Sequence, residues 1–241
     1  MTDQSLQFPQ FFVTAPAPCP YLSGREERKV FTELTGPEAP ALNEALSRVG
    51  FRRSQGVAYR PACEGCNACI SVRVRARDFT PRRRHRRLLR RNADLVATRR
   101  QAVATDAQFA LLRRYLDRRH RDGGMVDMDM QDYADMVENS PVETQVVEYR
   151  LPESVGGDLL AAALTDVMSD GLSMVYSFFD PAAAQRSLGI WMILEHIRHA
   201  AGVGLDHVYL GYWIAESPKM AYKAEFAPLE RLGPEGWYRF R

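Results

Sequence analysis

The residues best suited to chemistry lie in the loop Gln185-Arg186-Ser187-Leu188-Gly189, directly before an apolar helical stretch. The first backbone N–H groups of a helix have no acceptor within the helix, so this loop could bind a phosphate or a carbonyl oxygen. Arg186, Ser187 and Gly189 are therefore candidate catalytic residues that would stabilise an oxyanion. The alternative is an ordinary helix start that is capped by Ser187.

Four cysteines form a second candidate site, and they are Cys19, Cys63, Cys66 and Cys69. The last three have the spacing Cys-x-x-Cys-x-x-Cys, which in a cytosolic chain indicates a metal or cluster site more than a disulfide framework. Four thiolates match the ligand set of a tetrahedral zinc ion or an iron–sulfur cluster. Cys19 is distant in sequence from the others, and the alternative is a set of reduced structural thiols.

Arginines are concentrated in a few segments, although the formal net charge is only +2. Seven lie within ten residues, and a second cluster begins at Arg113. Guanidinium groups bind phosphates in a bidentate manner, so this distribution predicts a polyanionic partner, with solvated helix faces as the alternative. Together with two strand arginines, the first cluster supplies the candidate nucleic-acid contacts Arg73, Arg75, Arg82, Arg83, Arg84, Arg86, Arg87, Arg90 and Arg91.

Length and composition are those of an ordinary globular protein, with 241 residues, 46% hydrophobic and 26% charged. This length allows one large domain or two small ones. No apolar run reaches the roughly 18–20 residues of a membrane helix. Residues 1–7 lack the pattern of a signal peptide, so a cytoplasmic protein is expected.

The first half of the chain is expected to form strands around one helix. Cys69 to Phe79 alternates apolar and basic residues, which predicts a half-buried strand with a basic outer face. Thr80 and Pro81 are typical of a helix start and predict a helix that continues to Arg91. The other expected elements are strands at 8–14, 30–34, 50–55 and 94–98 and a helix at 37–49.

The second half is expected to position the loop described first. A helix at 106–121 and a short helix within 125–137 precede three antiparallel strands at 142–151, 159–168 and 172–179. A helix at 190–201, a strand at 206–214, a helix at 217–226 and an edge strand at 237–240 follow. This order predicts an α/β (α+β) fold of the acetyltransferase (GNAT) type, a mixed sheet flanked by helices, and the first half could be a degenerate copy. We expect domains at 1–100 and 101–241.

Several short motifs, spread over about residues 15–230, resemble one family. They are PCPYL at 18–22, GFRRS at 50–54, YRPxCxxCxxC at 59–69, RH at 119–120, YSFFDP at 176–181, RSLG at 186–189, YLGYW at 209–213 and KMxYK at 219–223. Together they resemble the bacterial aspartate/glutamate leucyltransferases, which are leucyl-tRNA–protein transferases related to the arginyl-tRNA–protein transferases. Relatives tend to have Pro where this chain has Ile70. Leu22 stands where the eukaryotic relatives have a second cysteine, which leaves the ligand set open.

The resemblance implies transfer of leucine from leucyl-tRNA to the N-terminal α-amino group of proteins that begin with Asp or Glu, which marks them for degradation. No cofactor is required for this chemistry, because the aminoacyl ester is reactive and positioning suffices. Asp180 is either the proton acceptor or a turn residue, and Tyr222 could hydrogen-bond the reacting groups. The candidate substrate-binding residues are Arg119, His120, Tyr176, Phe178, Leu188, Tyr212, Lys219 and Lys223.

Two other functions are compatible with parts of the sequence. The expected fold also suits an acetyl-coenzyme A-dependent N-acetyltransferase, although the 185–190 loop has fewer glycines than a pyrophosphate-binding loop prefers. The basic helix and the cysteine loop would also suit a non-catalytic, zinc-containing RNA-binding protein. The oligomeric state cannot be inferred from these patterns.

Overall fold

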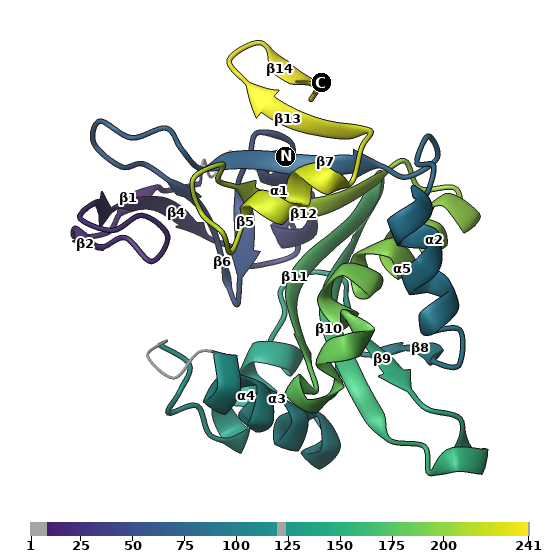
Figure 1. Cartoon of the computed structure of the whole chain (residues 1–241). Helices are drawn as coiled ribbons and strands as arrows, with labels where there is room; N and C mark the ends of the chain where they lie inside the picture. The colour runs from purple at the N-terminus through teal and green to yellow at the C-terminus, as the bar shows by residue number, and fades with distance from the viewer. Residues whose placement is uncertain (1–8, 120–123, 241) are drawn as a thin grey trace, which may run out of the picture.

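An eight-stranded mixed sheet is the centre of the computed structural model, which describes residues 9–119 and 124–240 (Figure 1). Its strands, in spatial order, are β14 (Gly236–Arg239), β13 (Leu229–Gly233), β7 (Ile70–Arg75), β12 (His207–Trp213), β11 (Gly171–Phe179), β10 (Leu159–Met168), β9 (Thr144–Arg150) and β8 (Val96–Gln101). All neighbours are antiparallel except β11 and β12.

The parallel pair β11 and β12 is joined by α5 (Leu188–Gly202), which follows the 3₁₀ segment Pro181–Arg186. The two strands pair only from Gly171 to Ser173 and from His207 to Tyr209, and beyond this point they separate. Antiparallel β9, β10 and β11 followed by a crossover helix and a parallel strand form the expected order, so the predicted acetyltransferase-like fold class is confirmed.

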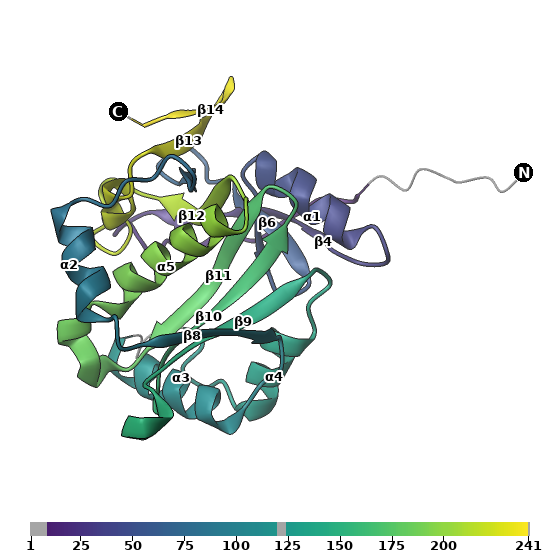
Figure 2. The same cartoon turned by 90° about the vertical axis from the view of Figure 1, so that its right-hand side faces the viewer.

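Helices cover both faces of this sheet (Figures 1 and 2). The alternation along β10 explains why, since successive side chains of a strand point to opposite faces. Ala161 and Ala163 belong to the core that includes α5 and Leu88 of α2 (Arg83–Arg91), whereas Ala162 and Leu164 belong to the core beneath α3 (Asp106–Arg119) and α4 (Met130–Glu138). No helix among the described residues has the length and apolar character needed to cross a membrane.

A second, four-stranded antiparallel sheet packs near one end of the first. Its strands are β1 (Phe12–Val13), β4 (Lys29–Glu33), β6 (Val57–Pro61) and β5 (Arg52–Ser54), accompanied by α1 (Ala39–Arg48) and the short pair β2 (Ala17–Pro18) and β3 (Glu26–Glu27). Buried Arg53 on β5 forms an ion pair with Asp166 on β10, and the Tyr212 hydroxyl donates to the Gly50 carbonyl at 3.0 Å. These contacts fix the small sheet against the large one.

Some expected elements differ in extent. Of the described residues 9–14, only Phe12–Val13 form a strand, and of residues 217–226 only Ala221–Glu225 are helical, as a 3₁₀ turn. Helix α2 begins at Arg83 rather than after Thr80, because the His85 ring accepts from the Arg82 N–H at 3.4 Å and sets the first turn there.

The proposed division at residue 100 falls within β8 and cuts through a single sheet, since β7 precedes it and lies between strands of the second half. The small sheet of the first half has only antiparallel pairs and so differs from the β11–α5–β12 unit. The division into two domains stays a prediction.

Candidate active site

A cavity of about 400 Å³ lies where β11 and β12 separate. Strand β11 contributes Met174 to Ser177 and Phe179, and β12 contributes Leu210 to Tyr212. The remaining lining residues come from both halves of the chain and are Tyr21, Arg52, Tyr59, Tyr115, Gly189, Ile193, Met220, Tyr222 and Lys223. Residues far apart in sequence thus converge at the topological switch point, where open α/β sheets commonly bind ligands.

The first turn of α5 borders this cavity through Gly189. The first hydrogen bond within the helix runs from the Trp191 N–H to the Ser187 carbonyl at 3.1 Å, so the preceding amides have no partner within the helix. Ser187 has a φ of 51° and its side chain makes no cap hydrogen bond, so the capping alternative does not hold. A Cβ atom at Gly189 would lie 3.3 Å from the Phe179 ring, and glycine therefore allows the helix to approach β11 closely.

Arg186 does not line the cavity. Its guanidinium binds both carboxylate oxygens of Asp94, at 2.9 and 2.8 Å, and it also donates to Asn92. The hydrogen bonds from Arg186 lower the pKa of Asp94. This pair fixes the loop to the segment after α2, so the Arg186 side chain has a structural role in this state rather than the expected contact with an oxyanion.

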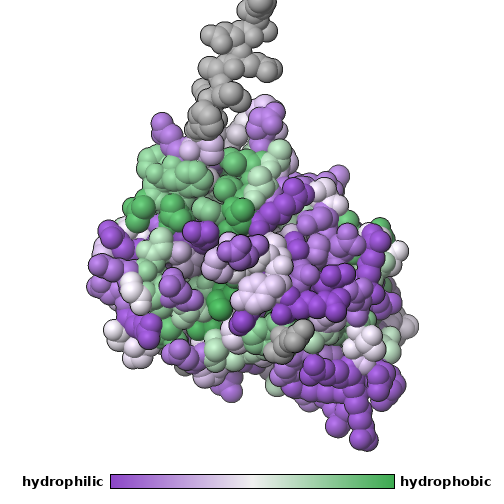
Figure 3. All heavy atoms as spheres, turned by 90° about the horizontal axis from the view of Figure 1, so that it is seen from above, coloured by the Kyte–Doolittle hydropathy of each residue, from purple (hydrophilic) through white to green (hydrophobic). Residues whose placement is uncertain are grey.

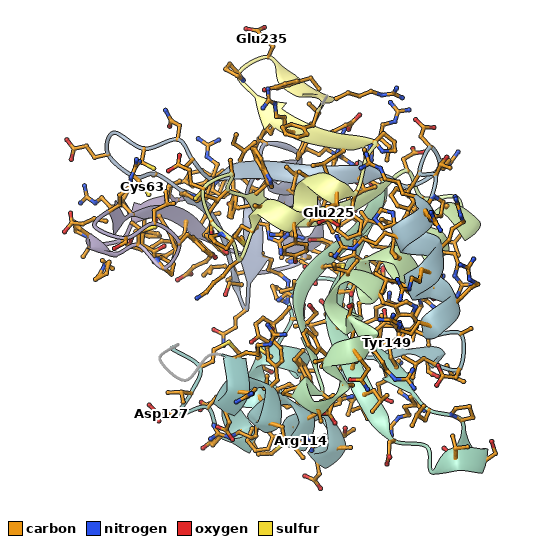
Figure 4. All side chains as sticks on the ribbon, viewed as in Figure 1. Cys63, Arg114, Asp127, Tyr149, Glu225 and Glu235 are labelled. Atoms are coloured by element: carbon orange, nitrogen blue, oxygen red, sulfur yellow. The ribbon has the colours of Figure 1, made fainter. Side chains whose placement is uncertain are left out.

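Asp180 also lies outside the cavity lining. Its Oδ1 accepts from the Ala182 N–H at 2.8 Å, and its Oδ2 lies 3.9 Å from Nη2 of Arg114. Figure 4 labels Arg114 on α3. The first contact is that of a turn residue before Pro181. Of the two roles considered for Asp180, the geometry favours the turn.

The candidate substrate-binding residues divide into three groups. Tyr176, Tyr212 and Lys223 line the cavity, as does the catalytic candidate Tyr222. Phe178 and Leu188 are instead 2% and 1% exposed and belong to the cores on the two faces of the sheet, so they do not contact this space. Lys219 is exposed and does not line the cavity. Arg119 also lies outside the lining, and its guanidinium lies 5.5 Å from the centre of the Phe179 ring. His120 lies outside the described residues.

Lys223 is a buried amine at the cavity wall. Its Nζ donates to the Tyr212 carbonyl at 2.6 Å. Burial, with a smaller contribution from Arg52, lowers the pKa of Lys223 to about 7. Burial also raises the pKa of Tyr212 and of Tyr222, so both hydroxyls remain neutral near physiological pH.

Arg52 is a cavity residue that the sequence analysis did not single out, although it lies within the GFRRS motif. Its Nη2 donates to the Met174 carbonyl at 2.6 Å, so the side chain reaches from β5 to β11. Side chains alternate along a strand, so Arg52 and Arg53 point to opposite sides of β5. The alternation could be predicted from the sequence, but the side of β5 that faces a cavity could not.

The candidate nucleic-acid arginines are not equivalent. Arg73 is bound to Glu230 at 2.8 Å and lies over the Trp237 ring, and Arg75 is bound to Asp78 at 2.7 Å. On α2, three arginines are tied to the protein, namely Arg84 to Glu225, Arg86 to the Pro81 carbonyl and Arg91 to the Gln185 carbonyl.

Of the arginines within α2, Arg83, Arg87 and Arg90 remain, and we call these three the α2 stripe, whereas the candidate Arg82 is the exposed N-cap residue that precedes the helix. They are exposed, and their spacing of four and three residues places them on one helix face. None of the described residues pairs with their guanidinium groups. Figure 3 shows hydrophilic side chains over the side of the molecule that carries α2 in Figure 1.

All four cysteines border a separate cavity of about 80 Å³ beside the small sheet, where Figure 4 labels Cys63. Burial raises the pKa of Cys69 to about 11, whereas the Ala68 backbone N–H and then Arg25 lower that of Cys66. Thiolates are the type of ligand that a soft metal prefers. The arrangement of these thiols does not match a metal site, since among the described residues no three His, Cys, Asp or Glu side chains are placed to hold a metal ion.

Comparisons with known proteins identify the family. Models of the arginine-tRNA-protein transferase N terminus and C terminus match residues 17–87 and 107–233. The chain is 60% identical to an aspartate/glutamate leucyltransferase of Parvibaculum lavamentivorans over 98% of each protein. It is also 60% identical to that of Sphingopyxis alaskensis, over 97% of this chain and 92% of the relative.

Among solved structures, FemX aligns with a TM-score of 0.46 at 10% identity, over 85% of this chain and 79% of that one. The sequence relatives span nearly the whole chain and include both the cavity and the cysteine loop. They confirm the resemblance that the motifs indicated and favour it over the N-acetyltransferase and the RNA-binding protein considered above. The chain belongs to the aspartate/glutamate leucyltransferases, within the arginine-tRNA-protein transferase family.

Proposed function

We propose that this protein transfers leucine from leucyl-tRNA to the N-terminal α-amino group of proteins that begin with Asp or Glu. The observation that carries the proposal is the cavity between β11 and β12, in which helix-terminal amides, apolar side chains and two cations meet. The names of the relatives support leucine as the transferred group and Asp or Glu as the acceptor.

The leucyl ester is the donor in this reaction. The amides at the start of α5 are suited to the ester carbonyl oxygen, since a helix N-terminus stabilises developing negative charge. Met174, Ile193 and Leu210 offer apolar surface for the leucyl side chain.

The acceptor must lose a proton before it attacks. Its α-ammonium has a pKa of about 8, so a weak base suffices. Lys223 is the cavity residue best suited to accept this proton, because its pKa of about 7 leaves a large neutral fraction. The amine then forms a bond to the ester carbon, the bond from that carbon to the ribose oxygen of the tRNA breaks, and the ribose oxygen takes up a proton.

The tRNA itself needs phosphate contacts outside the cavity. The α2 stripe supports such a role, because three exposed guanidinium groups that pair with none of the described residues can bind successive phosphates. Helix α2 packs against α5, whose first turn borders the cavity, so an acceptor stem on α2 would lie near the reacting ester.

The experiment that tests the proposal is a transfer assay with purified protein. Radiolabelled leucyl-tRNA or arginyl-tRNA is supplied with peptides that begin with Asp, Glu, Arg or Ala. Label is expected to move from leucyl-tRNA to the Asp and Glu peptides alone. Transfer from arginyl-tRNA would overturn the donor, and no transfer from either would contradict the proposal.

The cysteine cavity enters no step of this reaction. A structural zinc ion or iron–sulfur cluster on Cys19, Cys63, Cys66 and Cys69 stays a prediction, supported by the type of the ligands but not by their arrangement. Elemental analysis of protein purified without oxygen tests it. About one zinc ion, or several iron atoms, per chain that are lost in Cys63→Ser would support the site.

A further inference from the structure

The reaction proposed above needs a group that recognises the acidic side chain of the acceptor. We propose that Arg52 binds the side-chain carboxylate of the N-terminal Asp or Glu, a role that rests on the proposed function. Three observations support this assignment, namely the position of Arg52, the charges around the cavity and the free donor of its guanidinium.

Arg52 lies at the point where the parallel strands part. Its Nη2 donates to the carbonyl of Met174, the residue directly after the last paired residue of β11. On the opposite strand, a Cβ atom at Gly211 would lie 2.5–2.8 Å from atoms of the guanidinium group. Gly211 has a φ of 76°, so this position favours glycine and leaves room for the arginine. The guanidinium therefore spans the opening between β11 and β12.

Among the described residues, the cavity lining has two basic side chains, Arg52 and Lys223, and no Asp or Glu. The Lys223 Nζ is already bound to the Tyr212 carbonyl. Nη1 of Arg52 is buried and has no hydrogen-bond partner among the described residues. A buried guanidinium N–H without a partner is costly, and a carboxylate from a ligand would remove that cost with charge-assisted hydrogen bonds.

Arg53 shows what a buried arginine of this strand does when a carboxylate is present. It binds both oxygens of Asp166, at 2.6 and 2.7 Å, on the other side of β5. Arg52 has the same guanidinium group, but the described residues that line its cavity include no carboxylate. A bidentate contact accepts a carboxylate and not the amide of Asn or Gln, so it would select for Asp and Glu.

The test compares two acceptor peptides that differ only in an N-terminal Glu or Gln. With saturating leucyl-tRNA, Arg52→Gln is expected to lower kcat/KM for the Glu peptide about tenfold to 100-fold, mainly through KM. The value for the Gln peptide should remain nearly unchanged. The Kd of each peptide for the tRNA-free enzyme is measured in parallel, so that slow reaction of the Gln peptide does not obscure the comparison.

Arg60→Gln is the matched control, because Arg60 lies in the same sheet, donates to the Val49 carbonyl at 3.3 Å and does not line the cavity. It should leave the preference for Glu intact. Arg52→Lys keeps a charge without the fork, and it should lose part of the preference. It also serves as the variant to measure if Arg52→Gln does not fold.

An equal loss for both peptides would overturn the proposal, since a structural role or a role at the oxyanion affects every acceptor. A preference for Glu that survives in folded Arg52 variants would overturn it as well. A wild-type protein that binds the Glu peptide but transfers no leucine would contradict the proposed function instead, and the Kd values would still test Arg52.

Discussion

Lys223 links the chemistry of the cavity to the pH dependence of folding. Its pKa falls from 10.5 to about 7 in the folded protein, so between these values the unfolded chain binds more protons. The free energy of unfolding should therefore rise with pH across this window. Below pH 7 the amine is protonated in both states, so Lys223 contributes no further pH dependence there. We expect the melting temperature of wild type, relative to Lys223→Met, to increase from pH 7 to pH 10. Parallel curves for the two proteins would show that Lys223 is not buried as a neutral amine.

Asp180 and Tyr222 allow a second test at the residue scale. Asp180→Asn retains the oxygen that accepts from Ala182, and the side chain lies outside the cavity, so kcat should change less than about threefold. Tyr222→Phe removes a hydroxyl from the cavity wall and should lower kcat by about tenfold, the typical value of one hydrogen bond. Single-turnover rates of transfer measure both. A large loss in Asp180→Asn alone would restore Asp180 as the proton acceptor.

At the scale of the element, α2 separates arginines that bind the protein from arginines that are free for a ligand. Changing the α2 stripe (Arg83, Arg87 and Arg90) to Gln should weaken leucyl-tRNA binding at least tenfold near 0.1 M salt. The slope of log affinity against log salt should become shallower by about 2 to 3. Filter binding over a salt series measures both quantities.

The matched control lies on the same helix. Changing Arg84, Arg86 and Arg91 to Gln removes the same charge, but these side chains already bind Glu225 and two backbone carbonyls. The control should reduce affinity less than the stripe variant does. Equal losses in the two triple variants would mean that tRNA responds to the general charge of α2 rather than to one face.

At the scale of the whole molecule, local patterns predicted the elements but not every contact between them. The period of two in residues 69–79 and of 3.6 in residues 190–201 gave β7 and α5, because those periods follow from local backbone geometry. The insertion of β7 beside β12 depends on pairing over more than 130 residues, which no local pattern encodes.

The candidate site was predictable to a similar degree. The start of α5, whose first turn contains Gly189, was found because it is a local feature. Arg186 and Asp180 were assigned from their places in the loop, yet their partners, Asp94 and Arg114, come from other elements. Arg52 was missed for the same reason, since its position in the cavity depends on how the small sheet packs against the large one.

The ion pair between Arg53 and Asp166 is what we expect to hold the two sheets in register. Both side chains are 1% exposed, and Thr144 donates to the same carboxylate at 2.8 Å. Asp166→Asn leaves the arginine buried without a counter-ion, so the free energy of unfolding should fall by about 3–5 kcal/mol. Because Arg52 is the neighbouring residue, the same variant should also raise KM for the acceptor.

Denaturant unfolding of Arg53→Met, of Asp166→Leu and of the double variant that combines them measures the coupling. The double variant should be more stable than either single one, since no charge is left unpaired. It should nevertheless keep a raised KM if the ion pair positions β5 for the acceptor. If instead the losses of the two single variants add up to the loss of the double variant, the two side chains act independently. The alignment of the small sheet must then depend on other contacts, and the hydrogen bond from the Tyr212 hydroxyl to the Gly50 carbonyl is the first to test.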